Sequence, residues 1–126
     1  MLKDCGSGIF LLQGNKSSNI YFINQKDGII IDTGHPHQAA ENLNHLKEFG
    51  ITENDVKYII NTHSHPDHVG GNVEFLNYFS DVKIISSIKT QPYIKKKKQY
   101  AIYEDIEDAA EYYPIHIEVT DKEQFN

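Results

Sequence analysis

The 126-residue chain contains no tryptophan, one methionine and one cysteine. The single cysteine, Cys5, cannot form an internal disulfide, and it has no second cysteine with which to make a metal-binding pair. These absences exclude a small domain held together by disulfides. We therefore expect a reducing compartment, and specifically a cytoplasmic protein.

Long apolar runs and excess basic charge are also missing. No segment approaches the roughly 20 apolar residues of a membrane-spanning helix, and the apolar patch at residues 9–12 is too short for a signal peptide. The formal net charge is -6, which disfavours binding to nucleic acid. The lysine run at residues 95–98 is typical of a solvated helix face. We expect neither a membrane nor a nucleic acid among the partners.

What the chain does contain is the composition of a globular protein. Hydrophobic residues make up 39% and charged residues 24%, and the length suits one domain over residues 1–126. Segments rich in β-branched and aromatic residues alternate with segments of helical periodicity, which indicates an α/β layer structure. We expect strands at residues 8–14, 18–24, 28–32, 55–62, 81–87 and 115–121, and helices at 37–49, 73–79 and 99–113.

The most informative stretch is "NTHSHPDHVGG" at residues 61–71. His63 and His65 are two residues apart in an extended segment, so both side chains can face one ion. Asp67 and His68 follow where the chain turns, and they face a second position. Ligand sites in α/β folds gather at the carboxyl ends of strands, where this stretch lies.

Imidazole and carboxylate ligands suit zinc, and also iron or manganese. One or two such ions would lower the pKa of a bound water and make a hydroxide nucleophile available near neutral pH. The alternative interpretation is a polar surface loop. Four ligand-type residues at this spacing, after a buried strand and before a helix, favour half of a two-metal hydrolytic site.

"THSHPDHVGG" resembles the H-x-H-x-D-H motif of the metallo-β-lactamase superfamily, and "IIIDTG" at residues 29–34 resembles the strand and turn that precede it. The resemblance implies an αββα sandwich and a metal-dependent hydrolase. Position by position, it makes His63 and His65 ligands of a first metal, and Asp67 and His68 ligands of a second. It also makes Asp67 the catalytic residue that orients the attacking water, and Asp32 a support of the metal loop.

The substrate class follows from finer features of the motif. Histidine at position 68 is unlike the lactamases with arginine there, and histidine at 65 is unlike the flavodiiron proteins with glutamate. The "GGN" at residues 70–72 is similar to glyoxalase II, lactonase and thioesterase-like members. The resemblance therefore implies a small ester, thioester or lactone as substrate.

The later family motifs are missing from this chain. There is no G-H-T/S-x-G turn, and His116 lies in "YYPIHIEVTD", which resembles the strand before that turn. The resemblance thus covers the N-terminal half of the sandwich. Two hypotheses follow: a metallo-hydrolase, or a metal-binding half-domain or truncated fragment without turnover of its own. A half-domain would leave one apolar sheet face open, so we expect a homodimer.

One rival belongs to another mechanistic class. "IIIDTG" also resembles the D-T-G strand of aspartic proteases, whose short retroviral members work as dimers that pair two aspartates around one proton. The helical patterns at residues 37–49 and 99–113 do not suit an all-β protease, and the rival leaves residues 61–71 unexplained.

Overall fold

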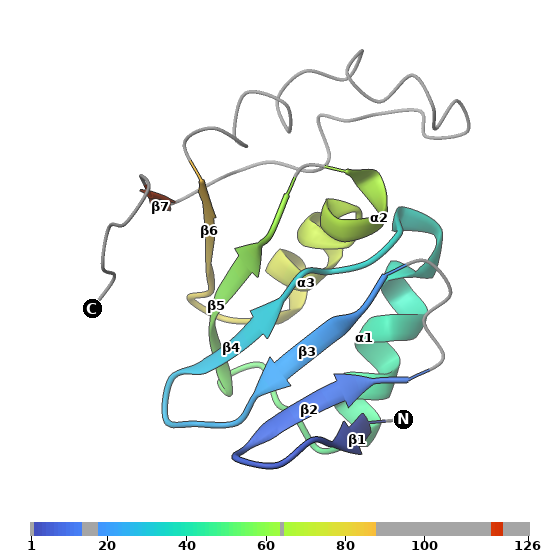
Figure 1. The fold of residues 1–126 in the computed structure, drawn as a ribbon, viewed down its shortest axis with the longest axis vertical. Helices are drawn as coiled ribbons and strands as arrows, with labels where there is room; N and C mark the ends of the chain where they lie inside the picture. The colour runs from blue at the N-terminus through green and yellow to red at the C-terminus, as the bar shows by residue number, and fades with distance from the viewer. Residues whose placement is uncertain (1, 14–17, 64, 88–116, 120–126) are drawn as a thin grey trace.

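The computed structural model describes residues 2–13, 18–63, 65–87 and 117–119. They form a mixed sheet with strands in the order β1-β2-β3-β4-β5-β6-β7 (Figure 1). The strands are β1 (Leu2–Asp4), β2 (Ile9–Leu12), β3 (Ile20–Ile23), β4 (Gly28–Ile31), β5 (Val56–Asn61), β6 (Lys83–Ser87) and β7 (Ile117–Val119). The α/β prediction is confirmed.

The strand pairing changes from antiparallel to parallel at β4. The pairs β1–β2, β2–β3 and β3–β4 are antiparallel, whereas β4–β5, β5–β6 and β6–β7 are parallel. Parallel neighbours need crossover connections, and these connections carry the helices. The helical elements are the 3-10 helix η1 (Pro36–Gln38), α1 (Ala39–Glu48), α2 (Pro66–Val69) and α3 (Asn72–Tyr78).

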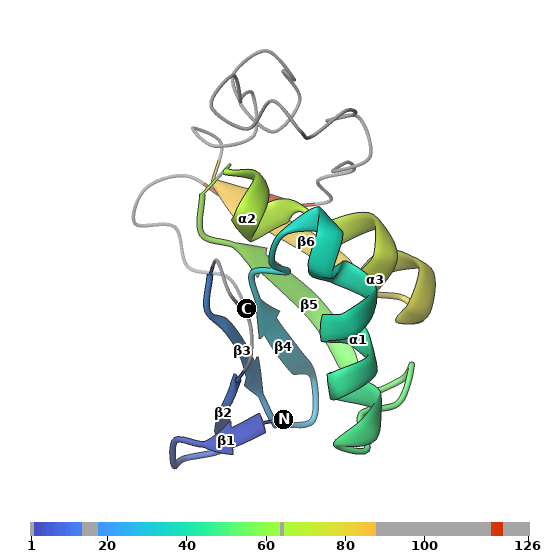
Figure 2. The same cartoon turned by 90° about the vertical axis from the view of Figure 1, so that its right-hand side faces the viewer.

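Figure 2 shows α1 and α3 on the same side of the sheet, next to one another. The Lys47 ammonium lies 4.3 Å from the centre of the Tyr78 ring, which joins the two helices by a cation–π contact. The buried apolar residues between helices and sheet form one cluster. It comprises Leu12, Ile20, Phe22, Ile30, Leu43, Leu46, Ile51, Val56, Ile59, Phe75, Phe79, Val82 and Ile84.

The other face of the sheet carries apolar side chains that are only partly buried. Strand residues alternate between the two faces, and directly paired residues share a face. The register therefore places one set of residues on the sheet face that points away from the helices. We call this set the open face: Ile9, Leu11, Tyr21, Ile23, Ile29, Ile31, Tyr58 and Ile60. In the described part of the chain, α1 and α3 cover only the face opposite to it.

Most predicted elements are confirmed, and the differences have physical causes. Strand β1 was missed because three residues with two charges carry no alternation; pairing with β2 stabilises it. Helix α1 is confirmed and ends before Gly50, which takes the left-handed conformation (φ 104°). Helical periodicity over residues 37–49 would place Phe49 on the buried face of α1, but Phe49 is 44% exposed, because it follows the helix as its C-cap.

Three further predictions lie outside the described residues: the solvated helix face at 95–98, the helix at 99–113 and the position of His116. Among the described helices, none has both the length and the apolar character needed to cross a membrane.

Candidate metal centre

The H-x-H-x-D-H loop lies where the parallel strands β4 and β5 end. Residues after β5 lead into the short helix α2, and a bridge between Gly34 and Val69 ties this helix to the segment after β4. The sequence predicted a turn here; the structure makes it one helical turn. The residues singled out in the sequence therefore meet Asp32 at one edge of the sheet.

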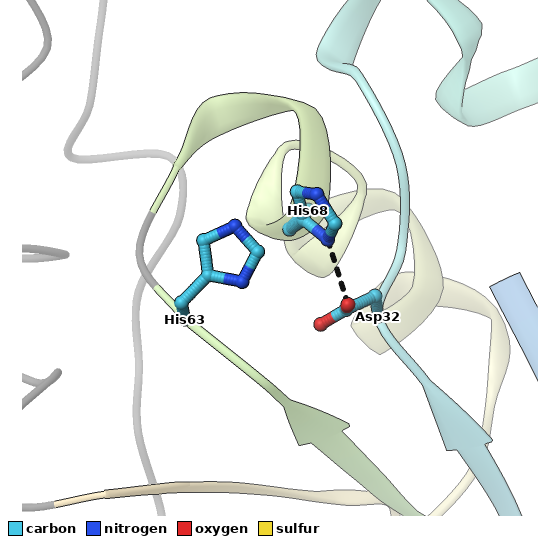
Figure 3. A group of neighbouring side chains, drawn as sticks. All are labelled: Asp32, His63 and His68. Carbon is cyan, nitrogen blue, oxygen red and sulfur yellow. Dashed lines mark hydrogen bonds and ion pairs between the residues drawn. The ribbon is translucent and has the colours of Figure 1, made fainter. Parts of the chain in front are cut away.

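Asp32 anchors the loop. Asp32 is 3% exposed, and its backbone is left-handed (φ 63°), a conformation that aspartate tolerates better than most residues. Oδ1 accepts a hydrogen bond from the Thr62 backbone N–H at 2.8 Å, and Oδ2 accepts one from the Thr62 hydroxyl at 2.6 Å. His68 Nδ1 lies 2.8 Å from Oδ2 (Figure 3). The support role expected of Asp32 thus has a structural basis in these three bonds.

Asp32, His63 and His68 form a compact group of potential metal ligands. One ligand atom from each lies within 4.8 Å of the others, and the rings of His63 and His68 have their centroids 3.9 Å apart. Figure 3 shows the three side chains converging from the ends of β4 and β5 and from α2. This arrangement brings together two of the four ligands predicted from the sequence.

The ring nitrogens of both histidines are oriented by neighbouring oxygens. Since the Thr62 hydroxyl donates to Asp32, its oxygen is free to accept from His63 Nδ1, which lies 3.0 Å away. His68 Nδ1 in turn donates to the Asp32 carboxylate. Both histidines then keep Nε2 for an ion, and a carboxylate behind a histidine is a common support of metal ligands. Asp32 therefore fits a supporting carboxylate better than a direct ligand.

Asp67 lies on the other side of His68. Its Oδ2 is 3.7 Å from His68 Nε2, close to the separation of about 3.3 Å between two ligands of a tetrahedral zinc ion. Its Oδ1 is buried and has no hydrogen-bond partner among the described residues. The Ser18 hydroxyl holds the Asp67 backbone by donating to its carbonyl at 2.5 Å. The pairing of Asp67 with His68 as ligands stays a prediction, and this geometry suits it.

His65 is more exposed than the other three predicted ligands. Its backbone is extended (φ -67°, ψ 142°), as expected for a residue before proline. Its ring centroid lies 5.1 Å from that of His63, but its atoms are outside the compact group. The joint binding of one ion by His63 and His65 therefore stays a prediction.

The environment favours the neutral form of His63. Burial lowers its pKa below the usual value of histidine, and the neighbouring His68 lowers it further. A neutral imidazole has a free lone pair, so metal binding at neutral pH does not first require the loss of a proton from His63.

The sequence did not reveal the polar residues beneath the loop. An asparagine before the apolar segment at residues 73–79 is typical of a helix cap, but Asn72 is the first residue of α3, and Gly71 occupies the cap position. The Asn72 side chain points instead into a buried hydrogen-bonded group with Thr33 and Asn61. The polar Asn61 at the end of the apolar strand β5 was the available indication, in the sequence, of a buried polar group at this place.

We expect Gly71→Ala to destabilise the protein, because a Cβ at this position would lie 2.4 Å from the Thr33 carbonyl oxygen. Backbone atoms would have to move, which costs about 1–3 kcal/mol by analogy with overpacked cores. Urea unfolding followed by circular dichroism would measure the change. An unfolding free energy equal to that of the wild type would show that α3 does not pack this closely against Thr33.

Comparisons with known proteins agree with this geometry. A sequence model of the metallo-beta-lactamase superfamily matches residues 14–125. The chain is 33% identical over 85 residues to Metallo-beta-lactamase domain-containing protein 1 of Xenopus laevis, a match that covers 68% of this chain and 33% of that protein. It is 26% identical over 113 residues to the probable hydroxyacylglutathione hydrolase glo2 of Schizosaccharomyces pombe, covering 86% of this chain and 43% of that protein.

Among solved structures, the Rm3 metallo-beta-lactamase superimposes with a TM-score of 0.71 at 23% identity. The superposition covers 94% of this chain and 45% of that one, and at this identity it shows the fold alone. The chain thus spans about a third to less than half of the length of these proteins.

Proposed function

The chain belongs to the metallo-beta-lactamase superfamily, and we propose that it is a metal-dependent hydrolase that acts on a small ester, thioester or lactone. The observation that carries this proposal is the convergence of Asp32, His63 and His68 within 4.8 Å, with both histidines oriented through Nδ1. A polar surface loop would not need a buried carboxylate behind it.

The donor set fits a metal ion. His63 and His68 offer Nε2 atoms, and Asp67 offers a carboxylate with one buried oxygen that lacks a partner among the described residues. Imidazole and carboxylate together suit zinc, with iron and manganese as alternatives. An ion bound here would lower the pKa of a water molecule and supply a nucleophile. In this proposal Asp67 accepts a hydrogen bond from that water and orients it.

The small-substrate part of the proposal is supported by one relative. The fission yeast protein is named as a probable hydroxyacylglutathione hydrolase, which is a hydrolase of a small acyl compound, and its match extends over 86% of this chain. The acidic balance of the sequence, with net charge -6, gives no reason to prefer a nucleic acid substrate.

We expect metal binding to depend on the H-x-H pair of the loop. Protein purified without chelator should carry zinc, iron or manganese, and the variant His63→Ala/His65→Ala should lose most of it. The chain offers a matched control in His35→Ala/His37→Ala, a second H-x-H pair with ring centroids 4.8 Å apart against 5.1 Å in the loop. Elemental analysis of the three proteins is the test. Equal metal content in all three would exclude the loop as the site.

We expect hydrolysis by this chain alone to be slow. Efficient hydrolysis needs ligands that fix the metal geometry, and the loop supplies at most two per ion if His63 and His65 hold one and Asp67 and His68 hold the other. Turnover of thioester and lactone substrates should be weak and should vanish in Asp67→Ala. Rapid turnover that Asp67→Ala abolishes would contradict the prediction of an incomplete site.

A second candidate function is a metal-binding half-domain that works as a homodimer. The open face favours it, because its eight apolar residues are only partly buried. The two candidates share the metal centre and differ in whether this chain turns over a substrate.

A further inference from the structure

Three polar side chains lie buried beneath the metal loop, and the proposed function uses none of them. Thr33 follows Asp32, Asn61 ends β5, and Asn72 begins α3. Their exposures are 0%, 3% and 0%. Buried polar groups are costly unless they are hydrogen-bonded. The hydrogen bonds among these three residues therefore offset the cost of burying their side chains. We call the three residues the clamp.

The two asparagines pair through their amides. Asn72 Nδ2 donates to Asn61 Oδ1 at 2.8 Å, and Asn61 Nδ2 donates to Asn72 Oδ1 at 3.1 Å. This reciprocal pair joins the end of β5 to the start of α3. The loop that contains all the predicted ligands begins directly after Asn61 and ends directly before Asn72. The pair therefore fixes the distance between the two ends of the loop.

Thr33 connects this pair to the loop backbone. Its hydroxyl donates to Asn72 Oδ1 at 2.8 Å and accepts from the Gly71 N–H at 3.1 Å. Its own N–H donates to the carbonyl of His68 at 2.9 Å. The adjacent Asp32 binds the His68 ring. One strand end thus holds His68 by both its side chain and its backbone.

We propose that the clamp positions His63 and His68 relative to each other and so sets the metal affinity of the site. The inference rests on the proposed function, because it requires that the loop binds a metal. Thr33, Asn61 and Asn72 do not touch the ion; they are positioning residues. The hydroxyl of Thr33 is the central element, since it bonds both Asn72 and Gly71.

The test compares Thr33→Val with Thr33→Ser. Valine replaces the hydroxyl by a methyl group, whereas serine keeps the hydroxyl and loses the methyl group. Zinc affinity is measured by competition with a chromophoric chelator at a temperature where all proteins are folded. We expect Thr33→Val to weaken zinc binding about 10- to 100-fold, the usual effect of losing a residue that supports metal ligands. Thr33→Ser should stay within a few-fold of the wild type.

A stability effect alone would not produce this difference. Ser86→Ala is the matched control, because Ser86 pairs with Asn61 across β5 and β6, and its hydroxyl is buried. That hydroxyl has no hydrogen-bond partner among the described residues. We expect Ser86→Ala to bind zinc like the wild type. Urea unfolding of each metal-free variant then separates loss of stability from loss of affinity.

The outcomes are distinguishable. Wild-type affinity in Thr33→Val, or equal losses in Thr33→Val and Thr33→Ser, would overturn the inference and leave the proposed function intact. Absence of zinc, iron and manganese binding by the wild type would overturn the proposed function and the inference with it. If Thr33→Val does not fold, Thr33→Ala removes the hydroxyl without adding a methyl group, and the same comparison applies.

Discussion

Replacing Asp32 by alanine should destabilise the protein by about 3 kcal/mol or more and abolish metal binding. The substitution removes the acceptor of three hydrogen bonds, from the Thr62 N–H, the Thr62 hydroxyl and His68 Nδ1. A hydrogen bond to a charged group contributes about 1.5–3 kcal/mol, and the bonds from the exposed Thr62 lie at the lower end of this range. His68 also loses the group that orients its ring. Urea unfolding and zinc titration of the same preparation measure both effects.

Part of this loss comes from the backbone, and a control isolates it. Asp81 also has a left-handed backbone (φ 59°), but its side chain is exposed. Asp81→Ala therefore carries the same backbone cost, about 1–2 kcal/mol, without the loss of buried bonds. If Asp32→Ala were no more destabilising than Asp81→Ala, the three bonds to Asp32 would contribute nothing.

Asp32→Asn tests the carboxylate itself, because it replaces one oxygen by an amide nitrogen and keeps the size of the side chain. Asparagine tolerates the left-handed backbone, and its oxygen can still accept from the Thr62 N–H. Its amide nitrogen would stand in place of Oδ2, where it would face donors from Thr62 and His68. We expect smaller destabilisation than in Asp32→Ala but a similar loss of zinc affinity, because the His68 tautomer depends on an acceptor at this point.

The sequence predicted the strands and the metal loop because their information is local. Short apolar runs such as residues 28–32 and 55–62 indicate strands that pack against helices. The H-x-H-x-D-H spacing likewise lies within one short segment. The position of Asp32 opposite the loop was accessible only through the family resemblance, since 36 residues separate it from His68.

The clamp could not be predicted for the same reason. Thr33 and Asn72 are 39 residues apart, and their contact exists only once β4 and β5 pair in the observed register. Read locally, Asn72 before an apolar segment indicates a helix cap, because asparagine is a favoured capping residue. In the folded protein the buried amide of Asn61 competes for the same side chain. Tertiary hydrogen bonding therefore overrides the local preference.

The open face favours the half-domain candidate, and we expect this face to mediate a homodimer. Its residues form two continuous apolar rows across four strands: Leu11, Tyr21, Ile31 and Ile60 in one, and Ile9, Ile23, Ile29 and Tyr58 in the other. Proteins rarely leave so large an apolar surface in water. A second copy offers an identical surface related by a two-fold axis, which is the commonest arrangement of soluble homodimers.

Light scattering at micromolar concentration should therefore give twice the mass of one chain, 14.5 kDa. Ile29→Lys places a charge on β4, an inner strand of one row, where it would be desolvated in the dimer, and should shift the protein to the monomer. Asn44→Lys adds the same charge on the exposed side of α1, where it should leave the mass unchanged. A stable monomeric wild type would contradict the half-domain hypothesis and would mean that the rest of the chain covers this face itself.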